Sequence, residues 1–120
     1  MGIAAALQVQ GERVSALDIE EALLRVAQEA LANIAHHSGA THVTIHLAWD
    51  GRAVRLTITD DGTGFDVARA TGRGVGLASM RERVAAHHGT LHISSKARAT
   101  TVEATIPLHG AAMPKAETTR

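Results

Sequence analysis

A stripe of polar side chains follows one face of the first helix that the sequence predicts. Glu29 and Asn33 are four residues apart, and His36 and His37 follow Asn33 by three and four residues. This spacing puts all four side chains on one side of a helix. A carboxylate and a carboxamide oxygen are hard ligands, suited to orienting Mg²⁺ or its waters beside phosphates. A solvated helix face would also explain the stripe when it is taken alone.

An acidic pair followed by two glycines forms a second group. The predicted strand that ends at Thr59 leads into Asp60-Asp61-Gly62-Thr63-Gly64-Phe65. A carboxylate at a strand end can accept a hydrogen bond from an exocyclic amine, and the glycines let a ligand approach closely. The alternatives are an ordinary acidic turn or a calcium loop. Calcium is disfavoured because a calcium loop needs more oxygen ligands at alternate positions than this segment has, and no closing Glu follows.

A glycine-rich run opens the second predicted helix. It reads Gly72-Arg73-Gly74-Val75-Gly76-Leu77. Free backbone N–H groups and the positive end of the helix dipole would converge there on an anion, and phosphate is the natural ligand. The run lacks the Lys-Ser/Thr ending of a P-loop and the GxGxxG spacing of a dinucleotide fold, so both of those nucleotide folds are poor candidates.

Two helices are predicted to carry these groups. Apolar residues recur at three- and four-residue intervals over residues 18–37, with Ser15 or Asp18 as the expected N-cap. A second helix is expected over residues 77–88, where Gly89 stops it.

The predicted strands follow from alternation of apolar and polar residues. Asp50-Gly51 joins two of them, because this pair tolerates the positive backbone angles of a tight hairpin turn. The strands are expected at residues 5–10 (an edge strand), 42–49, 54–58, 91–93 and 102–106, with a loop over 60–76.

Two helices and several strands favour a two-layer α/β sandwich, in which helices cover one face of a mixed, mostly antiparallel sheet. We expect one domain over residues 1–108 and a flexible polar tail over 109–120.

Composition narrows the classes of function. Twelve Lys and Arg balance twelve Asp and Glu, so no net positive field attracts nucleic acid or an anionic membrane. The chain has no cysteine and no apolar run long enough to span a bilayer, which favours a soluble cytoplasmic domain. Eight histidines raise a transition-metal site as an alternative, although helix-end and solvent-facing positions explain them more simply.

Taken in order, the three polar segments resemble the N, G1 and G2 boxes of the ATPase superfamily that gyrase, the Hsp90 chaperones, MutL and the histidine kinases share. The runs from Arg25 to Asn33 and from Gly74 to Val84 are similar to those of sensor kinases partnered with NarL-type response regulators. The resemblance spans nearly the whole chain and implies the Bergerat ATP-binding fold.

The resemblance also implies a role for each matching position. Asn33 would hold Mg²⁺, Glu29 would lie near its bound water or the phosphates, and Asp60 would accept the adenine amine. Gly62 and Gly64 would shape the adenine pocket, while Gly74, Gly76 and Leu77 would form the phosphate-facing end of the lid and helix. His36 stands where the family commonly has a lysine that reaches toward phosphate. The other nucleotide-binding residues expected are His37, Phe65, Gly72, Val75 and Thr100.

The implied function is that of the ATP- and Mg²⁺-binding catalytic domain of a protein-histidine kinase. Its partners would be the dimerisation domain that carries the phosphoacceptor histidine and, indirectly, a response regulator. No histidine of this chain lies in such a phosphoacceptor context, so an isolated monomer with little turnover is expected. The alternatives are a serine kinase of the anti-sigma-factor type, which shares the ATP-binding fold, and a degenerate module that binds without catalysis.

Overall fold

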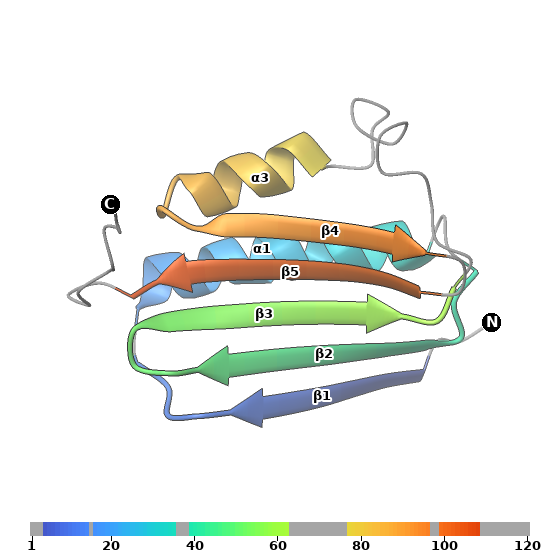
Figure 1. The fold of residues 1–120 in the computed structure, drawn as a ribbon, viewed down its shortest axis with the longest axis horizontal. Coiled ribbons are helices and arrows are strands. Elements are labelled where there is room, and N and C mark those ends of the chain that lie inside the picture. Colours follow the sequence, from blue (N-terminus) through green and yellow to red (C-terminus); the bar gives the residue numbers. More distant parts are fainter. Residues whose placement is uncertain (1–3, 15, 36–38, 63–76, 97–98, 109–120) are drawn as a thin grey trace.

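The computed structural model describes residues 4–14, 16–35, 39–62, 77–96 and 99–108. The strands and helices of this part of the chain form two layers (Figure 1). Their bounds are β1 Ala4–Gln10, α1 Leu17–Asn33, β2 His42–Trp49, β3 Ala53–Asp60, α3 Leu77–Ala85, β4 Thr90–Lys96 and β5 Ala99–Pro107.

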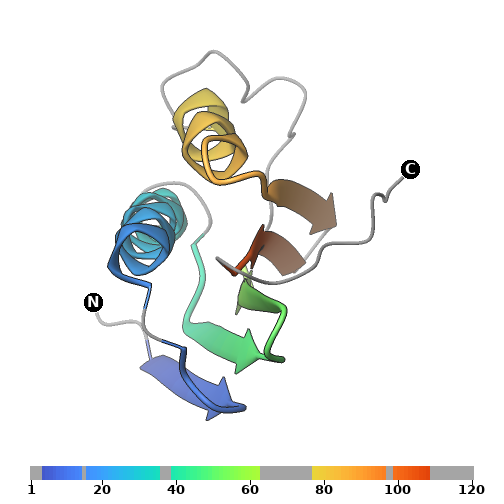
Figure 2. The same ribbon diagram turned by 90° about the vertical axis from the view of Figure 1, so that its left-hand side faces the viewer.

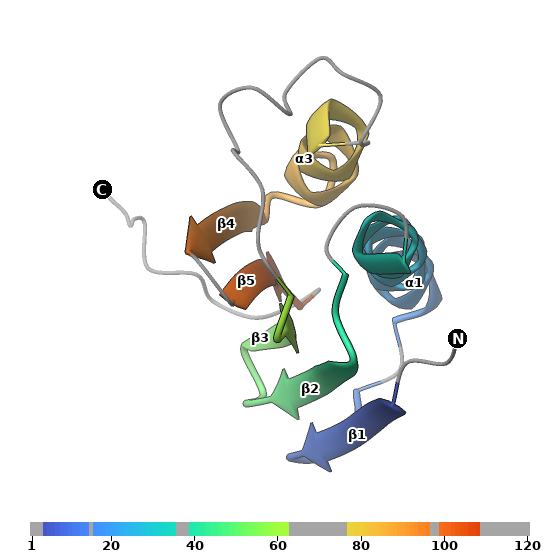
Figure 3. The same ribbon diagram turned by 90° about the vertical axis from the view of Figure 1, so that its right-hand side faces the viewer.

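The strands form one sheet with the order β1-β2-β3-β5-β4. β1 pairs with β2 in parallel, and the other neighbouring strands are antiparallel. Figures 2 and 3, which view the molecule from its two ends, show α1 and α3 on the same face of the sheet. The predicted α/β sandwich with a mixed, mostly antiparallel sheet is therefore confirmed.

Apolar side chains on the helix-facing side of β3 and β5 form the centre of the core. The register pairs Val54 with Ile106, Leu56 with Ala104 and Ile58 with Val102, so these side chains share one face. The outward-facing side is polar, with Arg55 Nε lying 3.7 Å from Glu103 Oε2. The helices bury Ile19, Ala22, Leu23, Val26 and Ala30 from α1 and Met80 and Val84 from α3 against this sheet.

The start of α1 differs from the prediction. The helix begins at Leu17 behind Ala16, whose side chain makes no capping bond. Asp18 lies inside the first turn, where its charge complements the helix dipole, so the prediction of Asp18 as the cap is wrong. Ser15, the other predicted cap, lies outside the described residues. A bidentate pair from Arg13 to Glu20, at 2.6 and 2.7 Å, instead joins the incoming chain to this end of the helix.

The end of α3 also differs from the prediction. The helix ends at Ala85, three residues before the expected His88. His88 N–H donates to the Ala85 carbonyl and Gly89 N–H to the Val84 carbonyl, the paired bonds of a Schellman motif. His88, not Gly89, takes the left-handed conformation, with φ of 65°. Gly89 is needed for space, because a Cβ there would lie 2.4 Å from the Thr105 carbonyl oxygen.

β1 is an edge strand, as predicted, and all seven of its residues are exposed. Leu7 and Val9 pair in register with Ile45 and Leu47, so they lie on the helix-facing side of the sheet. α1 does not cover them, and they remain 67% and 61% exposed. Neither described helix is long and apolar enough to cross a membrane.

Candidate functional site

The segments that carry the predicted site residues meet at one end of the molecule. α1 and β3 end there, and α3 and β5 begin there (Figure 1). The sheet register places Asp60, the last residue of β3, opposite Thr100 of β5 and beside Val43 of β2. Antiparallel pairing therefore brings together segments that are far apart in the sequence.

Asp60 is the most unusual polar group at this end. Its side chain lies on the helix-facing side of the sheet and is only 3% exposed. Gly62 N–H donates to Oδ1 at 2.7 Å, whereas no donor among the described residues reaches the buried Oδ2. Burial raises the pKa of Asp60, the bond from Gly62 partly offsets this, and the charge of Asp61 adds to the rise. A buried carboxylate oxygen without a donor is costly, so the site favours a ligand that supplies one.

Asp61, the next residue, has the opposite surroundings. The Thr41 and His42 backbone N–H groups both donate to Oδ1 at 2.9 Å, and the Thr41 hydroxyl donates to Oδ2 at 3.0 Å. The His42 ring nitrogen Nδ1 lies 3.1 Å from Oδ2. These hydrogen bonds, first those from the His42 and Thr41 backbone, hold the pKa of Asp61 well below its usual range. The two adjacent carboxylates therefore differ in their hydrogen bonding. Both oxygens of Asp61 accept hydrogen bonds from the chain, whereas Asp60 has one buried oxygen, Oδ2, with no donor among the described residues.

Asn33 and Glu29 lie on the last two turns of α1, next to α3. Asn33 is 9% exposed, so its side chain is not part of a solvated helix face. Glu29 is half-buried. It lines a polar hollow of about 150 Å³ between the helices, together with Arg25, Gln28, Ser79, Met80 and Arg83. Asn33 is thus buried at the end of α1, and Glu29, four residues earlier, borders the hollow between the two helices.

The predicted site is described only in part. Gly62 is buried beside Asp60, Thr100 is 3% exposed, and Leu77 is the first residue of α3. The described residues place Asn33, Asp60, Gly62 and Thr100 at one end of the molecule. The remaining predicted residues lie outside the described ranges: His36, His37, Gly64, Phe65, Gly72, Gly74, Val75 and Gly76.

A resident metal cluster does not occur within the described ranges. No three His, Cys, Asp or Glu side chains converge there. The histidines in these ranges are spread over β2, β4 and the turn after α3. Among the described residues, a cation at this end would have few protein ligands and would depend on a bound phosphate for others, as Mg²⁺ often does.

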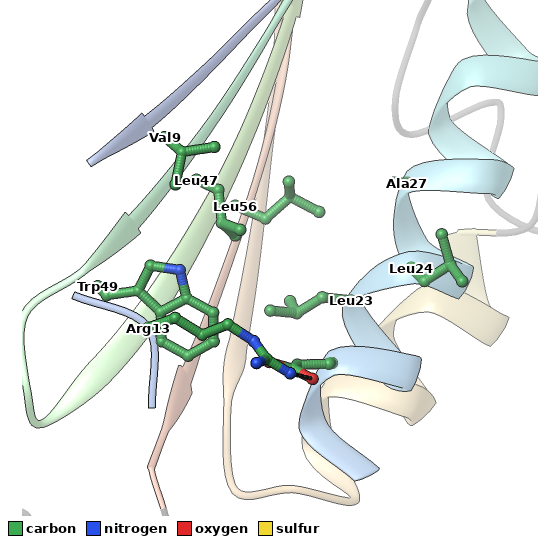
Figure 4. Close-up of a pocket in the computed structure, with 9 residues that line it drawn as sticks. Val9, Arg13, Leu23, Leu24, Ala27, Leu47, Trp49 and Leu56 are labelled. Atoms are coloured by element: carbon green, nitrogen blue, oxygen red, sulfur yellow. Dashed lines mark hydrogen bonds and ion pairs between the residues drawn. The ribbon is translucent and has the colours of Figure 1, made fainter. Parts of the chain in front are cut away.

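A second hollow, of about 320 Å³, lies toward the opposite end of the sheet. Figure 4 shows apolar side chains of β1, β2, β3 and α1 around it, with the Arg13 guanidinium at its border. Its lining is Val9, Arg13, Glu20, Leu23, Leu24, Ala27, Leu47, Trp49 and Leu56. The only charged groups of this lining, Arg13 and Glu20, are paired with each other, so the hollow offers no set of converging polar groups for catalysis.

The sequence did not predict the hydrogen bonds around Asp61 or this apolar hollow. The bonds join residues about twenty positions apart, and neither Thr41 nor His42 has a sequence signal that ties it to Asp61. Only the antiparallel pairing of β2 with β3 could have suggested their proximity.

The family and the curated proteins that match this chain are ATPases and histidine kinases. The family described as histidine kinase-, DNA gyrase B- and HSP90-like ATPases (HATPase_c) matches residues 18–110. The chain is 43% identical over 89 residues to the sensor histidine kinase MctS of Rhizobium johnstonii, covering 72% of this chain and 19% of that protein. It is 35% identical over 91 residues to the sensor histidine kinase LiaS of Bacillus subtilis, covering 75% of this chain and 25% of that protein.

Solved structures agree on the fold. The histidine kinase domain of the blue-light activated kinase of Erythrobacter litoralis EL346 superposes with a TM-score of 0.68 at 22% identity, covering 88% of this chain and 55% of that one. The chain spans about a fifth to a quarter of the length of the two curated relatives. The family match covers most of the chain and all of the site residues, and the chain belongs to the HATPase_c family of histidine kinase-, gyrase B- and HSP90-like ATPases.

Proposed function

We propose that this chain is the Mg²⁺-dependent ATP-binding domain of a sensor histidine kinase, which donates the γ-phosphate to a histidine on a separate dimerisation domain. The observation that carries the proposal is the buried Oδ2 of Asp60, which lacks a donor among the described residues. The exocyclic amine of adenine is a donor of the required kind. MctS and LiaS, to which the chain is similar, are both sensor histidine kinases.

The donor set at the end of α1 fits Mg²⁺. Asn33 and Glu29 each offer a hard oxygen within one helical turn of the other. When bound, Mg²⁺ neutralises charge on the phosphates during transfer. The protein residues bind and orient: Asp60 holds the base, and Asn33 fixes the cation and its phosphates. Phosphoryl transfer depends mainly on such positioning, so a domain without its phosphoacceptor partner would bind nucleotide but scarcely turn it over.

We further propose that the partner regulator is of the NarL type and that the domain works in the cytoplasm as a monomer. The run Met80-Arg81-Glu82-Arg83-Val84 at α3 is the feature that supports the NarL-type branch over the serine-kinase alternative. Met80 and Val84 are buried in the core, while Arg81, Glu82 and Arg83 are exposed. The Arg81 guanidinium donates to the Leu91 carbonyl at 3.2 Å, so Glu82 and Arg83 are the members of this run that a partner domain could contact.

A phosphotransfer experiment tests the donor role. The chain is mixed with the separately produced dimerisation domain of its own full-length kinase and with ATP labelled on the γ-phosphate. Label should appear on a histidine of the dimerisation domain, and Asn33→Ala should reduce the rate by at least about tenfold because it removes a group that positions the cation. Label on a serine instead would support the anti-sigma-factor type of kinase, and nucleotide binding without transfer would support a degenerate module.

A further inference from the structure

The hydrogen bonds of Asp61 tie the end of β3 to the start of β2. Two backbone N–H groups and one hydroxyl donate to its carboxylate at 2.9–3.0 Å. The Asp61 backbone N–H donates in turn to the His42 carbonyl at 3.2 Å. Both the main chain and the side chain of Asp61 are therefore held by the segment Thr41-His42.

This attachment fixes the groups on either side of Asp61. Asp60 is held by its register with Val43 and Thr100, and Gly62 N–H is held by Asp60 Oδ1 at 2.7 Å. Gly62 already donates to Oδ1, and Oδ2 is the buried oxygen that lacks a donor among the described residues, so Oδ2 is the oxygen expected to read a ligand. The direction in which Oδ2 lies thus depends on the path of the chain through residues 60–62, and Asp61 fixes the middle of that path.

We propose that Asp61 is a positioning residue that sets base selectivity: it makes no contact with the nucleotide and holds Asp60 and Gly62 where a purine amine can be distinguished from a purine carbonyl. The inference rests on the proposed function, because it requires Asp60 to read the base. A carboxylate held in place attracts the amine of adenine and repels the carbonyl oxygen of guanine, and such rejection is strong only where the polar group cannot move aside.

The chain supplies a matched control. Asp50 also accepts two backbone N–H bonds, from Arg52 and Ala53, both at 2.8 Å. It lies in the turn between β2 and β3, at the opposite end of these strands from Asp61. Removal of either carboxylate therefore loses similar backbone bonds, but only Asp61 adjoins the base-reading group.

The experiment is a calorimetric titration of ATP and of GTP, each with Mg²⁺, into the parent chain and the variants Asp61→Ala, Asp61→Asn and Asp50→Ala. Asp61→Ala should weaken ATP binding by about tenfold and narrow the ratio of ATP to GTP affinity, because it removes several charge-assisted bonds. Asp61→Asn should stay within about threefold of the parent in both, since its carboxamide oxygen still accepts from the two backbone N–H groups. Asp50→Ala should lower the melting temperature and leave both affinities unchanged.

A ratio of ATP to GTP affinity in folded Asp61→Ala equal to the parent's would overturn the inference. So would a loss of ATP affinity in Asp50→Ala as large as that in Asp61→Ala. If Asp61→Ala does not fold, the double variant Thr41→Val/His42→Ala decides, because it removes the side-chain bonds to Oδ2 and keeps the backbone ones. A smaller ratio of ATP affinity to GTP affinity in this variant supports the inference, and an unchanged ratio overturns it. Failure of the proposed function looks different: the parent itself would bind no ATP, or Asp60→Asn would bind it as well as the parent.

Discussion

Two neighbouring carboxylates, Asp60 and Asp61, show how backbone pairing assigns different chemistry to identical side chains. Asp60 points to the helix-facing side of the sheet and is buried. Asp61 lies just past the strand, where it is exposed and surrounded by donors. Their pKa values move in opposite directions, upward for Asp60 because of burial and downward for Asp61 because of hydrogen bonds.

The raised pKa of Asp60 predicts a specific dependence of stability on pH. A carboxyl group whose pKa is higher in the folded state favours folding while it is protonated, and that contribution is lost as the pH rises through the folded-state pKa. Ionised Asp60 should therefore destabilise the ligand-free domain at neutral pH. Asp60→Asn cannot ionise, so its free energy of unfolding should gain on that of the parent as the pH rises from about 4, the ordinary aspartate pKa, toward 7. Urea unfolding at a series of pH values measures the difference.

Asp61→Asn is the control for this pH series. The lowered pKa of Asp61 means that its stabilising contribution is present above the ordinary aspartate pKa and is lost as the pH falls through the folded-state value. The parent should therefore gain on Asp61→Asn as the pH rises toward about 4 and keep that advantage up to about pH 7. Over this upper range, by contrast, the parent loses stability relative to Asp60→Asn. If the difference in free energy of unfolding between Asp60→Asn and the parent does not change with pH, burial does not raise the pKa of Asp60.

The importance of Asp60 was predictable from the sequence, but its geometry was not. An Asp at the end of an alternating strand, followed by two spaced glycines, indicates a ligand-reading carboxylate. Which of its oxygens lacks a donor among the described residues depends on Gly62 and on the pairing of three strands. The attachment of Asp61 to Thr41 and His42 depends on contacts across about twenty residues, which local patterns do not encode.

The helices and the strands other than β1 were largely predictable because each buries one face. Alternation over β2, β3 and β5 and the three- and four-residue spacing in α1 both reflect the boundary between core and solvent. Helix ends were predicted less well. They depend on a few backbone bonds, and at α3 the residue type and the backbone conformation disagree: His88 takes the left-handed position that sequence patterns assign to glycine.

The conformations of His88 and Gly89 predict opposite effects on stability when each residue is replaced. His88→Gly should stabilise the domain by roughly 0.5 to 1 kcal/mol, because relief of the left-handed strain exceeds the added entropy of the unfolded chain. Gly89→Ala should destabilise it by about 1–3 kcal/mol, because the new Cβ would meet the Thr105 carbonyl oxygen and the side chains of Val84 and Ile106. Thermal or urea unfolding of the two variants beside the parent measures both effects. Destabilisation by His88→Gly, or tolerance of Gly89→Ala, would contradict this description of the helix end.

The residues that stabilise the fold and the residues proposed to bind nucleotide lie in different parts of the molecule. The core lies between β3, β5 and the two helices, while the segments that carry the residues of the site meet at one end of these elements (Figure 1). The parallel pairing of β1 with β2 could not be derived from alternation, because two strands of either orientation would show the same pattern. The family resemblance implied the Bergerat fold, which helices on a single face of the mixed sheet bear out.

Adenine recognition by Asp60 and Mg²⁺ binding by Asn33 are tested together by a calorimetric titration of ATP, with and without Mg²⁺, into the parent chain, Asp60→Asn and Asn33→Ala. The parent should bind ATP and bind it more tightly with Mg²⁺. Asp60→Asn should lose at least about tenfold in affinity because a donor replaces the acceptor that faces the adenine amine. Asn33→Ala should bind with an affinity that no longer responds to Mg²⁺. No binding by the parent, or equal binding by folded Asp60→Asn, would show that Asp60 does not bind adenine in this domain.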